Sequence, residues 1–213
     1  MYKGKIFKQV LGIPMGTNCA PYLANLFLHC YEARYIENLI RTGKSDQAKL
    51  LSDVFRYQDD CIVFNDGHTF NDNAMNIYPR EMVLKETNIS PAMVHYLDLC
   101  IQCVDGKFVY KSFDKRLDFN FEVINYPDLS GNIPTNQAYG VFMSQLIRFC
   151  DINCSFKDFQ ADIVALVNKL KRLGYLEDVL RTKFLQFYHS QIQRWSKFGR
   201  DLFKMVDIFS NRE

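Results

Sequence analysis

Two adjacent carboxylates, Asp59 and Asp60, are the residues of this chain whose type and spacing best suit a chemical role. They lie between two runs of strand-forming residues, 55–57 and 61–64, so we expect them at the turn of a β-hairpin. Two negative charges this close repel each other unless a cation or a shared proton lies between them. The pair therefore predicts a metal site. The alternative is an ordinary turn, because Asp is favoured in turns and needs no function there.

A loop that contains two glycines and a proline precedes a long helical pattern, and both lie upstream of the Asp pair. The loop consists of Gly12, Ile13, Pro14, Met15 and Gly16. Gly16 allows the backbone to approach a ligand closely. Apolar residues then recur near helical spacing over 23–40, and Gly43 suits the end of a helix. A loop, a helix and a carboxylate-bearing hairpin in this order suit a nucleotidyl-transfer site.

These motifs resemble those of reverse transcriptases. The loop and helix resemble a motif of that family through Gly12, Pro14, Gly16, Ala20, Pro21, Leu23 and Asn25. The segment 57–60, Tyr-Gln-Asp-Asp, resembles the Tyr-x-Asp-Asp box of the family. Further motifs are similar to the Penelope-like retroelement branch, namely Pro14-Met15-Gly16, Tyr96-Leu97-Asp98, Asp114-Lys115-Arg116, Ile133-Pro134 and Ser144-Gln145-Leu146-Ile147-Arg148. The resemblance runs from about Lys5 to the C-terminus.

The resemblance implies an α+β fold in which a partial polymerase palm precedes an all-helical thumb. The palm is expected to be an antiparallel sheet with helices on one face. We expect the palm over residues 1–118, a connection over 119–133 and the thumb over 134–213.

Local patterns predict further elements. Strands are expected at 5–11, 82–87, 94–104 and 107–113. Asp105-Gly106 predicts a tight turn between the last two, because both residues of such a turn adopt positive φ. Helices are expected at 135–150, at 156–173 and from Leu176 toward Trp195. Ser155 suits the N-cap of the second of these helices and Gly174 its end.

The resemblance also implies roles for individual residues. Asp59 and Asp60 would bind Mg²⁺, for which Mn²⁺ can substitute, with Asp59 as the principal ligand. Lys85 would protonate the leaving pyrophosphate, and the alternative is an exposed strand lysine without a role. Contacts to an RNA template, a DNA primer and deoxynucleotides are expected from Gly12, Pro14, Met15, Gly16, Asn25, Tyr57, Gln58 and Leu97. The nucleic-acid backbone is expected to contact Lys169, Lys171 and Arg172.

A two-metal site also needs a carboxylate from a separate strand, because two neighbouring Asp residues cannot surround two ions. In reverse transcriptases that carboxylate precedes the Gly-Pro-Gly loop, whereas the first acidic residue here is Glu32, inside the long helical pattern. We therefore expect a truncated reverse transcriptase that lacks the fingers and is inactive alone. Two alternatives remain: a non-catalytic RNA- or DNA-binding remnant of a retroelement, and a decayed copy without a selected role.

Composition sets broad limits on the class of protein. The 213 residues are 48% hydrophobic and 23% charged, which indicates a chain that folds. The net charge of +2 is weak support for nucleic-acid binding, but residues from Pro134 onward carry 12 Lys and Arg against 8 Asp and Glu. No apolar run approaches the roughly 20 residues that span a bilayer, so no membrane association is expected.

The cysteines predict an intracellular protein, either nuclear or cytoplasmic. There are seven of them, an odd number, and residues 1–12 lack the pattern of a secretory leader. A zinc quartet could be drawn from Cys100, Cys103, Cys150 and Cys154. The odd spacing of Cys100 and Cys103 within a strand argues against it, because the two side chains would then lie on opposite faces.

Overall fold

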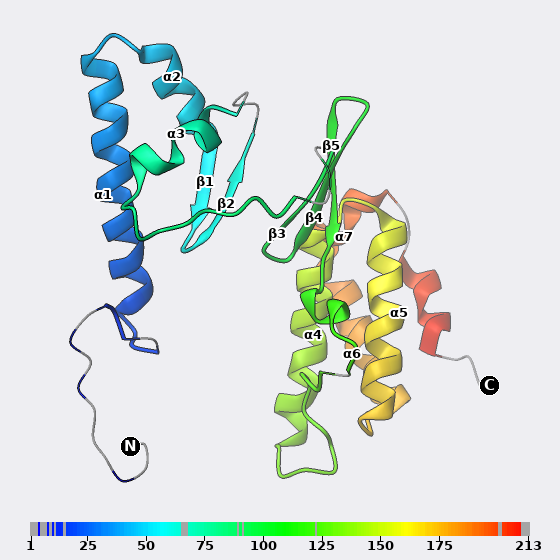
Figure 1. Ribbon diagram of the computed structural model, residues 1–213. Helices are drawn as coiled ribbons and strands as arrows, with labels where there is room; N and C mark the ends of the chain where they lie inside the picture. The colour runs from blue at the N-terminus through cyan, green and yellow to red at the C-terminus, as the bar shows by residue number, and fades with distance from the viewer. Residues whose placement is uncertain are drawn as a thin grey trace. The chain divides into compact units, whose positions relative to one another are not determined.

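The computed structural model describes residues 4, 8, 10, 12–14, 16–64, 68–88, 90, 92–121, 123–199 and 202–209. In these residues the fold is α+β, with two small antiparallel sheets followed by an all-helical C-terminal region (Figure 1). The chain divides into two units, Met1–Thr87 and Asn88–Glu213, and each is considered separately. The strand expected at 5–11 lies largely outside the described residues. None of the helices in the described part has the length and apolar character of a membrane span.

The first unit combines helices with one β-hairpin. Its elements are α1 (Ala20–Arg41), α2 (Ser45–Leu50), the 3-10 helix η1 (Leu51–Asp53), β1 (Val54–Tyr57), β2 (Asp60–Val63) and α3 (Thr69–Ile77). Helix α1 has Pro21 in its first turn, where the missing N–H costs nothing. It ends as predicted near Gly43, whose φ of +76° favours glycine.

The apolar residues of α1 pack mainly on other helices. The core of the first unit consists of Leu28, Leu39, Ala48, Leu51, Phe70, Ile77 and Tyr78, contributed by α1, α2, η1 and α3 and by the residue that follows α3. The palm was expected to be a sheet with helices on one face, but here the hairpin adds only partly buried residues to this cluster, Val54, Cys61 and Val63. Near the start of α1, Tyr22, Leu23, Leu26 and Phe27 are exposed.

The strand expected at 82–87 is absent. Residues 82–88 have no regular structure and all of them are exposed. The N–H of Met82 donates to the carbonyl of Pro79 at 2.9 Å, so the segment starts as part of a turn. A strand needs a partner for its backbone hydrogen bonds, and no strand in the described residues pairs with this one. The sequence prediction here was wrong.

The second unit begins with a three-stranded sheet in the order β3 (Met93–Tyr96), β4 (Leu99–Val104) and β5 (Lys107–Ser112). The predicted Asp-Gly turn is confirmed, with φ of +51° at Asp105 and +72° at Gly106. The single strand expected over 94–104 was wrong, because the chain reverses at Leu97 and Asp98. Leu97 has a φ of +52°, which starts a second tight turn and divides the run into β3 and β4.

All the regular elements that the structure describes after β5 are helices. They are α4 (Thr135–Ile152), α5 (Phe156–Arg172), α6 (Glu177–Ser190), α7 (Ile192–Trp195) and the 3-10 helices η2 (Lys115–Asp118), η3 (Ser196–Phe198) and η4 (Leu202–Phe209). The predicted cap is confirmed, since the hydroxyl of Ser155 accepts from the N–H of Asp158 at 3.1 Å. The third helical pattern is interrupted at Gln191, between α6 and α7.

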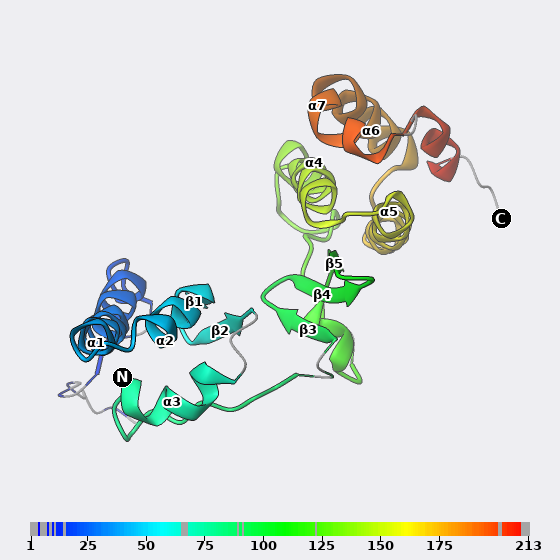
Figure 2. The ribbon, with the colours of Figure 1, turned by 90° about the horizontal axis from the view of Figure 1, so that it is seen from above.

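The core of the second unit is formed by the faces of these helices. Its fully buried side chains include Phe142, Phe159, Phe184, Phe187, Leu146, Ile163, Leu170 and Leu180. In Figure 2, which shows α4 and α5 nearly end-on, the three-stranded sheet lies beside these two helices.

A buried polar residue joins the sheet to the helices. The Asn153 side chain follows α4, is 0% exposed and accepts from the N–H of Ser112 on β5 at 3.0 Å. Its amide nitrogen donates to Asp162 on α5 at 2.7 Å, and Asp162 also accepts from the Ser112 hydroxyl at 2.6 Å. By its contacts the sheet thus belongs to the helical unit. The palm and thumb boundaries at residues 118 and 134 stay a prediction.

Candidate functional site

The β1–β2 hairpin presents Asp59 and Asp60 at an exposed turn, as predicted. Tyr57 pairs with Asp60, so Gln58 and Asp59 form a two-residue turn. Gln58 has a φ of +55°, which is uncommon for a residue other than glycine and suits the first position of a tight hairpin turn. Both Asp residues are exposed. Their carboxylates are therefore accessible to a ligand.

Arg56 on β1 ties this turn to helix α1. Its Nη1 donates to the side-chain oxygen of Asn25 at 2.8 Å and to the carbonyl of Gln58 at 3.1 Å. Its Nε donates to Oε1 of Glu32 at 2.6 Å. Figure 1 shows the turn end of the hairpin beside the N-terminal half of α1. Hydrogen bonds from Arg56 thus connect the turn that carries Asp59 to helix α1.

Both side-chain oxygens of Glu32 accept hydrogen bonds from neighbouring residues. Its Oε1 accepts from Arg56 and, at 2.7 Å, from the hydroxyl of Tyr78, while its Oε2 accepts from Nη2 of Arg56 at 3.3 Å. Burial alone raises the pKa of Glu32, but the hydrogen bonds from Arg56 and Tyr78 and the charge of Arg56 lower that pKa below its ordinary value. Burial and the bond to Glu32 raise the pKa of Tyr78. Because both oxygens of Glu32 are occupied, it does not replace the missing metal ligand.

Sequence reasoning assigned no role to Arg56 or Glu32. The signal for Arg56 was the alternation of β1, which places Arg56 on the same face as Val54 and leaves Phe55 and Tyr57 exposed. A cation on the inner face of a strand needs a carboxylate partner. The sequence has four acidic residues before Arg56, namely Glu32, Glu37, Asp46 and Asp53, so the structure was needed to identify Glu32 as the partner.

The turn offers suitable ligand atoms for a metal ion but too few of them. Asp59 and Asp60 offer the oxygen ligands that Mg²⁺ prefers. Within the described part of the chain, however, no group of three or more His, Cys, Asp or Glu side chains could hold a metal ion. Two neighbouring carboxylates do not make a two-metal site, so we derive no chemical step through a metal here.

The remaining predicted residues of the first unit lie in different environments. Gly12 and Gly16 are exposed and both have a φ of +85°, a conformation that favours glycine, whereas Met15 lies outside the described residues. Pro14 is exposed and its carbonyl accepts from the Thr17 hydroxyl at 3.1 Å. Lys85 is exposed in the irregular segment 82–88. Its role as a proton donor stays a prediction.

The second unit contains a cleft of about 700 Å³, which we call the hairpin–helix cleft. It is formed by the β3–β4 turn, the connection after β5, and helices α4 and α5, and its lining includes Leu97, Arg116, Phe119, Arg148, Lys169 and Arg172. The structure thus brings together three of the predicted site residues, Leu97, Lys169 and Arg172. Lys171 is not part of the lining and instead forms an ion pair with Glu177 at 3.4 Å.

Two ion pairs shape this cleft. Nη2 of Arg148 lies 2.7 Å from Oδ2 of Asp98 in the β3–β4 turn. Arg116 binds Asp114 through two bonds of 2.6 and 2.9 Å, and these bonds hold the pKa of Asp114 below its usual range. Asp98, part of the Tyr96-Leu97-Asp98 motif, therefore has a structural partner in Arg148.

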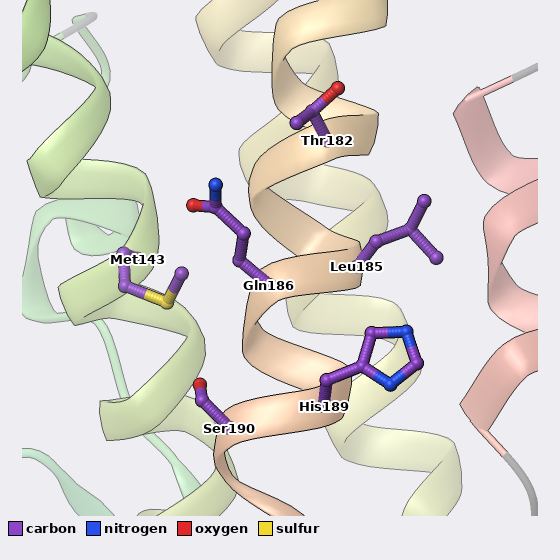
Figure 3. Close-up of a pocket in the computed structure, with 6 residues that line it drawn as sticks. All are labelled: Met143, Thr182, Leu185, Gln186, His189 and Ser190. Atoms are coloured by element: carbon purple, nitrogen blue, oxygen red, sulfur yellow. The ribbon is translucent and has the colours of Figure 1, made fainter.

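A second groove runs along α6 and includes one residue of α4 (Figure 3). It is lined by Met143, Thr182, Leu185, Gln186, His189 and Ser190. In Figure 3 these side chains spread along the helices and do not converge on one point. The lining contains no Lys, Arg, Asp or Glu and none of the predicted site residues. This groove is a poor match for a phosphate-bearing ligand.

All seven cysteines are free thiols. Cys100 is buried and Cys103 exposed, in keeping with their expected positions on opposite faces of a strand. Cys150 is also buried, and burial raises its pKa to about 11. The sulfur of Cys154 accepts from the N–H of Tyr110 at 3.3 Å.

No protein-family model matches the chain, and comparisons with curated proteins and with solved structures give no match either.

Proposed function

We propose that this chain is part of a reverse transcriptase of the Penelope-like retroelement type, an RNA-directed DNA polymerase lineage of retrotransposons. The observation that supports the proposal best is the exposed Tyr57–Asp60 turn, whose carboxylates are accessible and whose position is fixed to α1 by Arg56. In this proposal the first unit belongs to the palm, and α4 to α7 form the helical thumb.

The proposed chemistry is nucleotidyl transfer with an RNA template, a DNA primer and deoxynucleotides. Bound Mg²⁺ or Mn²⁺ ions would lower the pKa of the attacking hydroxyl and neutralise charge on the triphosphate. Asp59 and Asp60 would supply two of the carboxylates. The sequence has no acidic residue before Glu32, which is engaged by Arg56, so a further carboxylate has to come from another segment or chain.

Binding of Mn²⁺ and of an RNA–DNA hybrid tests this proposal. We expect weak Mn²⁺ binding, measured by electron paramagnetic resonance, that is lost in Asp59→Asn/Asp60→Asn. Asp53→Asn is the matched control, because Asp53 is an exposed acidic residue before β1, away from the turn. We also expect hybrid binding that weakens as salt rises, because phosphate contacts release counterions. A chain that binds neither Mn²⁺ at the turn nor the hybrid would refute the proposal.

Primer extension by this chain alone is expected to be absent with either metal. The physical reason is the missing third carboxylate, since the Asp59 and Asp60 oxygens cannot coordinate two ions from opposite sides. The assay measures elongation of a labelled DNA primer on an RNA template. Extension that disappears in Asp59→Asn would show that the site is complete and that this expectation is wrong.

A second candidate function is non-catalytic nucleic-acid binding by a retroelement remnant. The hairpin–helix cleft favours it, because its cationic and aromatic lining belongs to the second unit and does not depend on Asp59 or Asp60. Hybrid binding without any Mn²⁺ binding at the turn would support this candidate over the polymerase.

A further inference from the structure

Cationic side chains outnumber carboxylates in the hairpin–helix cleft. Three lining residues are acidic, and five are cationic, namely Lys115, Arg116, Arg148, Lys169 and Arg172. Asp98 and Asp114 are neutralised by the ion pairs with Arg148 and Arg116. Asp162 accepts from the hydroxyl of Ser112 and the amide of Asn153. The formal charge of the lining is +2, which favours an anionic ligand.

Two exposed aromatic rings lie in the same cleft. Phe119 is 51% exposed and Phe121 63% exposed, and their ring centroids are 5.3 Å apart. Both follow η2 in the connection between the sheet and the helices. Exposed rings beside cations form the kind of surface on which unpaired nucleic-acid bases stack while the phosphates stay near positive charge.

Lys169 is positioned to face such a ligand. Its Nζ donates to the carbonyl of Val123 at 3.1 Å and lies 5.6 Å from the ring centroid of Tyr126. Neither of these two partners carries a negative charge, and the positive charge of Lys169 is one of the causes that lower the pKa of Asp114 in the same lining. These contacts also tie the connection after Phe121 to α5. Lys115, at the start of η2, adds an exposed cation to the lining.

The size of the cleft limits what it can hold. A volume of about 700 Å³ lies within the range typical of small-ligand pockets, and roughly one or two nucleotides fit such a space. A base pair inside a duplex has both faces stacked on its neighbours, so it cannot stack on Phe119 or Phe121. An unpaired nucleotide offers a free face and a phosphate together.

We infer that the hairpin–helix cleft binds an unpaired nucleotide of a single-stranded nucleic acid, with the base on Phe119 and Phe121 and the phosphate at the cationic lining. The inference rests on the proposed function for the class of ligand. The position of the binding site in the chain is inferred only from contacts within the second unit.

Fluorescence anisotropy of a fluorescein-labelled oligothymidylate of about eight nucleotides tests the inference on the full chain. We expect Phe119→Ala/Phe121→Ala to weaken binding roughly tenfold or more, because base stacking is lost. Phe108→Ala is the matched control, since Phe108 is an exposed aromatic residue on β5 that does not line the cleft. Unchanged affinity in the double variant, or an equal loss in Phe108→Ala, would overturn the inference.

The charged part of the site has its own matched pair of variants. We expect Lys169→Gln to reduce affinity and to lower the slope of log affinity against log salt by about 0.7. Lys171→Gln, two residues along the same helix but paired with Glu177, should bind as the unchanged chain does. Equal effects of the two variants would contradict a localised site and indicate a diffuse positive surface.

Competition experiments identify the occupant. Unlabelled oligothymidylate should displace the probe, whereas thymidine triphosphate or polyglutamate at equal charge concentration should not. Displacement by the triphosphate would assign the cleft to a free nucleotide, and displacement by polyglutamate to any polyanion, and either result would refute the inference.

The proposed function and this inference fail in different ways. If the Phe119→Ala/Phe121→Ala chain loses no single-strand binding but the chain still binds the hybrid and Mn²⁺, only the inference is wrong. The chain could instead bind neither the hybrid nor Mn²⁺ but bind single strands through Phe119 and Lys169. In that case the polymerase proposal is wrong and the inference about the cleft is supported.

Discussion

Arg56→Met is expected to destabilise the first unit by about 2–4 kcal/mol. The Arg56 side chain is 11% exposed and makes the hydrogen bonds that join β1 to α1 through Glu32 and Asn25. Methionine fills similar space but leaves the carboxylate of Glu32 partly buried with only Tyr78 as a donor. An uncompensated charge of this kind costs more than the pair contributes, because its lost hydration is no longer replaced.

Hydrogen exchange of the β1–β2 amides, read by mass spectrometry, measures this loss in the first unit. Arg34→Met is the matched control, since Arg34 lies on α1 but is exposed. The fluorescence of Trp195, the only tryptophan, should not change, because Trp195 lies in the second unit. Similar exchange in Arg56→Met and in Arg34→Met would contradict the structural role of Arg56.

The same contacts make the stability of the first unit depend on pH. The pKa of Glu32 is lower in the folded chain than in the unfolded chain, where it is about 4.3. The contribution of Glu32 is therefore present above that value and is lost as the pH falls through the folded pKa. Glu32→Gln should remove this part of the acid sensitivity of the β1–β2 amides. If the Glu32→Gln variant keeps the same acid sensitivity, other carboxylates cause the loss of stability at low pH.

Turn and cap residues could be predicted from the sequence, because their conformations are set locally. Asp105-Gly106 and Gly174 occupy positive φ, and Ser155 caps its helix through its own hydroxyl. The turn at Leu97 was missed because it has no Gly, Pro or Asn to mark it. Residues 96–98, Tyr-Leu-Asp, nevertheless resemble residues 57–59, Tyr-Gln-Asp, because each segment has Tyr first and Asp third. In both turns the residue after Tyr has positive φ, so this shared pattern was the available signal.

Contacts between distant segments could not be predicted in the same way. The absence of a strand over 82–87 depends on whether another strand pairs with it, which local propensity does not decide. The Lys169, Lys171 and Arg172 group shows the same limit for the site. All three are basic and close in sequence, but only the structure separates the two that line the cleft from Lys171, which pairs with Glu177.

Asn153→Ala is expected to destabilise the second unit by about 2–4 kcal/mol. The side chain is fully buried, and its removal leaves the N–H of Ser112 without its acceptor and Oδ2 of Asp162 with one donor fewer, the hydroxyl of Ser112. Urea unfolding followed by Trp195 fluorescence measures the loss, because Trp195 is buried in the same unit. Asn168→Ala is the control, since Asn168 is exposed on α5.

Asn153→Asp separates the hydrogen bonds from the volume of the side chain. It keeps the shape of Asn153 and the acceptor for Ser112, but it replaces the donor to Asp162 with a second negative charge. Two carboxylates at this distance repel, so the variant should be destabilised near neutral pH and should partly recover as the pH falls and one of them takes up a proton. The unfolding midpoint of Asn153→Asp therefore rises with acidification relative to that of Asn153→Ala. A midpoint that follows Asn153→Ala at every pH would show that the hydrogen bond from Asn153 to Asp162 does not contribute to the stability of the second unit.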